Sequence, residues 1–134
     1  MESDMRDNRG FTLIELLIVI VILCILAAMA IPKISNTRDK SHFATMESDL
    51  KNLASQQEIY YADERSYTAE KSDLAFMSSR DVTISINVDP GGWSATATHV
   101  ALGPSEGCSI YHGSIPALSF LVTPSGPDEV VCTR

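Results

Sequence analysis

The chain has 134 residues and carries 10 Lys and Arg against 17 Asp and Glu, a formal net charge of −7 at pH 7. This acidity argues against a general binder of nucleic acid or of anionic membranes. Residues 11–31 read FTLIELLIVIVILCILAAMAI, an apolar run with a single charge, Glu15. Residues 32–134 are rich in Ser, Thr, Asp and Gly, so they offer little material for a large core. These features argue against a free cytosolic enzyme.

The apolar run predicts a membrane-spanning helix. As a helix, residues 11–31 would extend about 31 Å, which matches the roughly 30 Å of a bilayer's hydrocarbon core. A secretory signal peptide is the alternative, because Ala27, Ala28 and Ala30 resemble a small-residue cleavage site. Its apolar stretch would be shorter, so we favour the membrane helix. The basic residues on the two sides of the run are too evenly balanced to give its orientation.

Glu15 is the one carboxylate inside this run, four residues from its start. In one interpretation it lies at the membrane boundary and reaches toward the interface. In the other it forms an ion pair with a cation of another chain, so that two costly charges neutralise each other in a low dielectric. The residues around Glu15 favour the second interpretation.

The octapeptide RGFTLIEL, residues 9–16, resembles the class III signal of type IV prepilins and of type II secretion pseudopilins. In that family a short polar leader ends in Gly, the mature chain begins with Phe, and a Glu follows four residues later. The resemblance implies that residues 1–10 are a leader. A membrane prepilin peptidase would cut between Gly10 and Phe11 on the cytoplasmic side and methylate the new Phe11 amine. It also implies that Glu15 is an assembly residue, paired with the Phe11 amine of a neighbouring subunit.

Helical spacing continues beyond the apolar run. Pro32 falls where the family commonly has a helix-bending proline, and proline removes a hydrogen-bond donor. Many members also have a glycine midway along this helix, whereas residues 11–31 contain none. We expect one helix with a membrane half, residues 11–32, and an amphipathic half, residues 33–63, whose apolar stripe packs on a sheet. Charged residues, Asp49 among them, fall largely off the stripe. Its members are Phe43, Met46, Leu50, Leu53, Gln57 and Tyr60.

Residues 64–134 are predicted to form a globular head with a small antiparallel sheet. The polar segment 63–80 is typical of a loop, with a short helical turn at 72–76. After it, alternating apolar residues on both sides of the sequence DPGG predict a β-hairpin. The fold class is therefore α+β, and the pilin fold is similar. The expected strands are 81–89, 93–99, a third that includes 109–111, and a fourth at 119–122 or 130–132.

Two cysteines of the head, Cys108 and Cys132, are predicted to form a disulfide. The bond would close a loop of 24 residues and stabilise the head by roughly 3 kcal/mol. A metal or redox pair is the alternative, although neither cysteine belongs to a CxxC motif. A disulfide needs an oxidising compartment, so the head is expected outside the cytoplasm. Many type IV pilins also close their C-terminal region with a disulfide, which favours a pilin over the major secretion pseudopilin.

No catalytic arrangement is visible in the sequence. The three histidines are scattered, without metal-ligand spacing or a catalytic motif. We expect no cofactor, although related pseudopilins bind calcium in acidic head loops. Solvated surface charge is the better interpretation of such residues here. The calcium candidates are Asp89, Glu106, Asp128 and Glu129. Tyr60, Tyr61 and Tyr67 are interpreted as packing residues at the end of the long helix.

We therefore expect a structural subunit, not an enzyme, that polymerises into a type IV pilus filament. The resemblance implies a single-pass protein of the inner (cytoplasmic) membrane that later enters an extracellular or periplasmic filament. The implied partners are other copies of the chain, the prepilin peptidase, and the assembly platform and its ATPase; nucleic acid is not expected. Two alternatives stay open: a type II secretion pseudopilin, and a minor subunit that binds DNA or surfaces.

Overall fold

The structure is a computed structural model that describes residues 10–115 and 121–133; of residues 31–33 and 35 it describes the backbone alone. Its contacts divide the chain between Thr37 and Arg38 into two compact units. Apart from Gly10, the leader predicted at residues 1–10 lies outside the described residues.

A single helix, α1 (Leu13–Glu64), begins in the first unit and ends in the second, as the stripe and the apolar run predicted. In the first unit, Leu13–Ala30 is long and apolar enough to cross a membrane, and all its residues are exposed in the single chain. A helix suits this segment because it satisfies every backbone hydrogen bond internally. Helix continues across Pro32, and the bend expected there stays a prediction.

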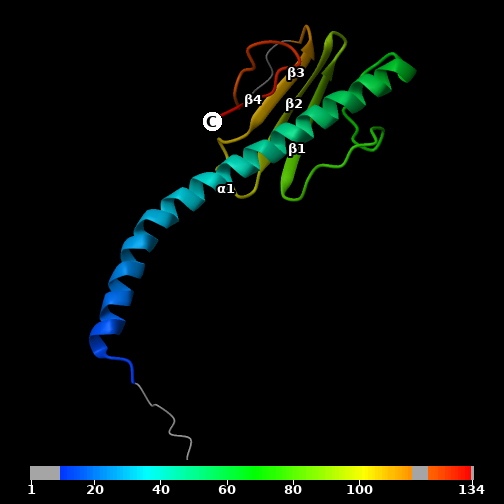
Figure 1. The fold of residues 1–134 in the computed structure, drawn as a ribbon. Helices are drawn as coiled ribbons and strands as arrows, with labels where there is room; N and C mark the ends of the chain where they lie inside the picture. Colours follow the sequence, from blue (N-terminus) through cyan, green and yellow to red (C-terminus); the bar gives the residue numbers. More distant parts are fainter. Residues whose placement is uncertain (1–9, 116–120, 134) are drawn as a thin grey trace, which may run out of the picture. The chain divides into compact units, whose positions relative to one another are not determined.

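In the second unit the rest of α1 lies on a four-stranded antiparallel sheet of order β1-β2-β3-β4 (Figure 1). β1 (Val82–Asp89) and β2 (Gly92–His99) form the predicted hairpin. β3 (Cys108–Gly113) contains the predicted third strand, and β4 (Val131–Cys132) lies at the second of the two expected positions. The α+β pilin-like fold class is thus confirmed.

One local expectation was wrong, and one of the two positions offered for the fourth strand is not used. Residues 71–75 form hydrogen-bonded turns and no helical turn, with the Leu74 amide donating to the Lys71 carbonyl. Leu121 and Val122, the described part of the other position expected for the fourth strand, are not in a strand. Alternation over so few residues is a weak signal, because a strand forms only where a neighbour supplies hydrogen-bond partners.

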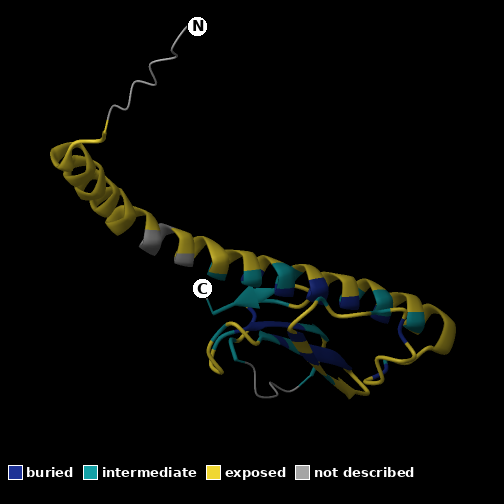
Figure 2. Cartoon of the chain, turned by 90° about the horizontal axis from the view of Figure 1, so that it is seen from below, coloured by how far each residue is buried: buried dark blue, intermediate teal, exposed yellow. Residues whose placement is uncertain are grey.

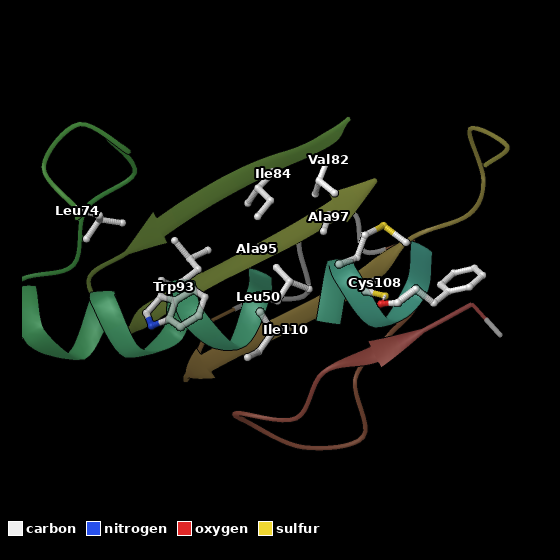
Figure 3. Close-up of a cluster of buried hydrophobic side chains, with 12 residues drawn as sticks. Leu50, Leu74, Val82, Ile84, Trp93, Ala95, Ala97, Cys108 and Ile110 are labelled. Atoms are coloured by element: carbon white, nitrogen blue, oxygen red, sulfur yellow. Dashed lines mark hydrogen bonds between the residues drawn. The ribbon is translucent and has the colours of Figure 1, made fainter. Parts of the chain in front are cut away.

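The core lies between the stripe of α1 and one face of the sheet (Figure 2). Alternate residues of each strand point to α1, since successive side chains of a strand face opposite sides. Figure 3 shows Leu50 of α1 near Trp93, Ala95 and Ile110 of the sheet. Trp93, the only tryptophan of the chain, is fully buried.

Two polar residues of α1 are buried because they hold the loop that leads to β1. Gln57 donates to the Thr68 carbonyl at 2.6 Å and accepts the Thr68 amide at 3.2 Å, so it pairs with the backbone much as a neighbouring strand would. Asp49 accepts the amide of Ser79 at 2.7 Å and its hydroxyl at 2.8 Å. The placement of Asp49 off the packed stripe was therefore wrong. Its carboxylate is buried because the loop supplies both hydrogen bonds.

A disulfide joins Cys108 of β3 to Cys132 of β4, which confirms the predicted pairing. The two residues are direct partners in the sheet register. The bond ties the C-terminal end of the chain to the buried part of β3, where Cys108 is fully enclosed.

Candidate processing and assembly site

The predicted cleavage position lies just before α1. Gly10 and Phe11 are in irregular backbone, and the Phe11 side chain is 76% exposed. A peptidase needs an accessible, non-helical backbone, so the geometry is compatible with a cut between these two residues. The cut itself stays a prediction.

Glu15 lies in the first turn of α1 and forms a capping box with Thr12. Its Oε2 accepts the Thr12 amide at 2.9 Å and the Thr12 hydroxyl at 2.7 Å. In return, the Glu15 amide donates to Thr12 Oγ1 at 3.3 Å. Thr12 is thus the N-cap residue and Glu15 the third residue of the helix, and the pair satisfies amides that a helix start leaves unpaired.

This capping role was missed in the sequence, although the pattern Thr-x-x-Glu ahead of an apolar run is its signature. Within the described structure, both hydrogen bonds to the carboxylate use Oε2. A carboxylate has about four acceptor positions, so Oε1 remains available to a further donor. Capping therefore holds a negative charge at the helix start, beside Phe11, without using up its capacity to bind.

The candidate calcium ligands are not assembled into a site. No group of three or more His, Cys, Asp or Glu side chains that would suit a metal ion occurs among the described residues. Asp89 Oδ1 accepts the Gly91 amide at 3.3 Å within the β1–β2 turn. Oδ1 of Asp128 lies 2.6 Å from Nδ1 of His112. These carboxylates have local structural partners.

The histidines are less scattered in the structure than predicted. The rings of His42 on α1 and His99 on β2 lie 4.0 Å apart. His112 on β3 contacts Asp128 and also faces Glu58 of α1, with 3.8 Å between Nε2 and Oε1. These contacts pack elements of the head together.

The tyrosines at the end of α1 pack as predicted, and they also line an open hollow. Tyr61 and Tyr67 stack with ring centroids 4.7 Å apart, and the Tyr67 hydroxyl donates to Glu58 at 3.3 Å. Burial and the negative charge of Glu58 raise the pKa of Tyr67 to about 12. The hollow has a volume of about 610 Å³ and is bordered by the β1–β2 turn.

Comparison with known proteins finds a known motif at the start of α1. Residues 5–31 match the family model described as the prokaryotic N-terminal methylation motif. The chain is 34% identical, over 103 residues, to the type IV wide pilus major component PilA4 of Thermus thermophilus, and the match covers 77% of this chain and 79% of that protein. The chain belongs to the family of type IV pilins and type II secretion pseudopilins.

Other members of the family match over a smaller share of their length. Type II secretion system core protein G of Pseudomonas aeruginosa is 30% identical over 66% of this chain and 61% of its own. The type IV major pilin protein PilA of Myxococcus xanthus is 37% identical over 54% of this chain and 33% of its own. The relatives are structural proteins, and membership implies processing of the leader and polymerisation into filaments.

Proposed function

We propose that the chain is the repeating subunit of a type IV pilus. The observation that carries this proposal is the methylation motif directly ahead of α1, in a chain similar over most of its length to a major pilus component. The Cys108–Cys132 disulfide supports it, since the bond requires an oxidising compartment and therefore a head outside the cytoplasm. Leu13–Ala30 then anchors the precursor in the inner membrane, with residues 1–10 in the cytoplasm.

Cleavage between Gly10 and Phe11 releases an amine at the head of an apolar helix. A prepilin peptidase makes the cut and then methylates the amine, which keeps its positive charge at neutral pH. The amine of one subunit binds Oε1 of Glu15 in the next, and the two membrane charges neutralise each other. An assembly platform and its ATPase extract the subunits from the membrane into the polymer.

A type II secretion pseudopilin is the second candidate, favoured by the similarity to core protein G. Two observations separate the candidates. Long surface fibres made mainly of this chain support the pilus subunit over both a pseudopilin and a minor, surface-binding subunit. A head whose stability depends on calcium would support the pseudopilin.

Intact mass of the purified chain tests the processing steps. We expect a chain that begins at Phe11, carries one added methyl group and lacks two hydrogens because of the disulfide. A product beginning near Ala30 would instead show that the apolar run is a signal peptide.

Two substitutions separate the assembly role of Glu15 from its capping role. Glu15→Gln keeps an oxygen that can accept from Thr12 but removes the charge, so it should be cut normally and enter filaments poorly. Thr12→Val removes the hydroxyl of the capping box and keeps the charge, so it should assemble far better than Glu15→Gln. Equal assembly of Glu15→Gln and the wild type would contradict the charge pair.

A further inference from the structure

The hollow at one end of the head is lined by both apolar and charged side chains. Tyr61, Tyr67, Val88 and Pro90 supply ring and aliphatic surface, and we call this site the tyrosine hollow. Arg65 and Asp89 lie among its lining residues, and both are exposed. Neither forms an ion pair with any other described residue. A concave surface that combines rings and aliphatic groups with charges outside any ion pair is suited to receive a complementary protrusion.

A protrusion of this kind lies at the opposite end of the sheet. Val100 and Ala101 follow β2 and are exposed, Val100 by 73%. Hydrogen bonds fix this turn: the Val100 amide donates to the Asp81 carbonyl at 3.1 Å, and the Ala101 amide to His99 Nδ1 at 3.1 Å. We call residues 100–101 the Val100 turn. Because it is already ordered, binding it elsewhere costs little conformational entropy.

Charged residues flank the Val100 turn as they flank the hollow. Arg80 and Asp81 are exposed, and within the described structure neither takes part in an ion pair. The turn offers one positive and one negative charge, and the hollow offers Arg65 and Asp89. The two surfaces can therefore form ion pairs with each other.

Two independent measures place these surfaces at opposite ends of the head. In the sheet register Asp89 pairs with Gly92 beside the hollow, and Val82 pairs with His99 beside the turn. Along β1, Asp89 and Val82 are about 23 Å apart at the usual rise of a strand. Along α1, His42 contacts His99 and Tyr61 lines the hollow, a helical distance of about 28 Å. Figure 1 shows the hairpin lying along this part of α1.

We infer that the Val100 turn of one copy binds in the tyrosine hollow of a second copy in the same filament, so that their heads stack end to end along α1. This second copy is not the one whose Glu15 pairs with the Phe11 amine, because that pairing offsets two copies by only four helical residues, about 6 Å. The contact joins two different surfaces of the same chain at opposite ends of the head. A contact of this type repeats without closing and so generates an open filament. The inference rests on the proposed function, because it names a contact within the filament.

Cysteine cross-linking in the full-length chain tests this contact. The variant carries Val88→Cys and Val100→Cys in a Cys24→Ala background, which removes the free cysteine of the apolar segment. Mild oxidation of its filaments should yield a ladder of covalent multimers. Either single substitution should yield monomers only, because the contact joins unlike surfaces. Multimers from Val100→Cys alone, or no ladder from the pair, would overturn the inference.

A matched pair of charge substitutions provides the second test. Val100→Asp would place a carboxylate against the rings and aliphatic groups of the hollow, and the fraction of chain in filaments should fall about tenfold or more. Met77→Asp alters a loop residue that is 92% exposed, and it should assemble normally. Membrane levels of both monomers should equal the wild type, since neither side chain is part of the core.

The outcomes also separate this inference from the proposed function. Wild-type filaments together with normal assembly of Val100→Asp would overturn the contact and leave the hollow to another occupant, while the pilus function stands. A wild-type chain that never polymerises would refute both.

Discussion

For the substitution Gln57→Leu, the sequence pattern and the structure predict opposite changes in the stability of the head. Gln57 is the only polar member of the apolar stripe, so the pattern alone predicts that leucine would extend the core and stabilise the head. In the structure Gln57 is fully buried and bonded to both backbone groups of Thr68, itself 9% exposed. Leucine would leave an amide and a carbonyl unpaired, at about 1–3 kcal/mol each.

The apolar surface that leucine buries offsets about 2 kcal/mol of this loss. We therefore expect a net destabilisation of about 2 kcal/mol, which lowers the urea midpoint by about 1 M. Trp93 fluorescence reports the transition in the full-length chain in detergent, since it is the only tryptophan and is fully buried. Asn52→Leu, on the exposed side of α1, is the matched control and should change stability little. A Gln57→Leu chain as stable as the wild type would refute the role given to the Thr68 pairing.

Three further predictions concern the head. Replacing Cys108 and Cys132 by serine should lower the free energy of unfolding by about 3 kcal/mol, measured in urea, because it frees a loop of 24 residues. Asp49→Ala should leave the partly buried amide and hydroxyl of Ser79 without their acceptor, and limited proteolysis should then cut the loop before β1 much faster than in the wild type. The pKa of Tyr67 is raised to about 12, so the folded state holds the Tyr67 proton more tightly than the unfolded state. The free energy of unfolding should therefore fall as pH rises from about 10 to about 12. Tyr67→Phe should remove this part of the pH dependence, and ultraviolet phenolate absorbance of the wild type should follow the Tyr67 titration over the same range.

Much of the fold could be predicted because its signals are periodic and local. The apolar run and the stripe of α1 repeat over many residues, and the hairpin strands alternate around a turn-forming sequence. β4 has two residues, too few for any period, and it exists because Cys132 pairs with Cys108 in the register of β3. The burial of Asp49 could not be predicted for a related reason. Its burial depends on Ser79, thirty residues away, and nothing near Asp49 in sequence signals that partner.

The candidate site divides in the same way. Gly10, Phe11 and Glu15 could be recognised because they lie within six consecutive residues of a motif that the sequence alone displays. The capping box was also local and could have been found from Thr12 and Glu15. The tyrosine hollow could not, because it joins the end of α1, the loop after it and the β1–β2 turn, which only the folded chain brings together.

The exposed surface of Leu13–Ala30 limits what can specify the filament. Lipid chains are about as apolar as leucine, so moving this segment from the bilayer to a bundle of like helices gains little from the hydrophobic effect. Helix–helix packing alone would also accept many relative positions along so uniform a surface. Specificity must then come from other features of the chain, the charge of Glu15 and the surfaces of the head. A filament with a single register therefore needs both, and loss of either should give disordered or short polymers and not merely weaker ones.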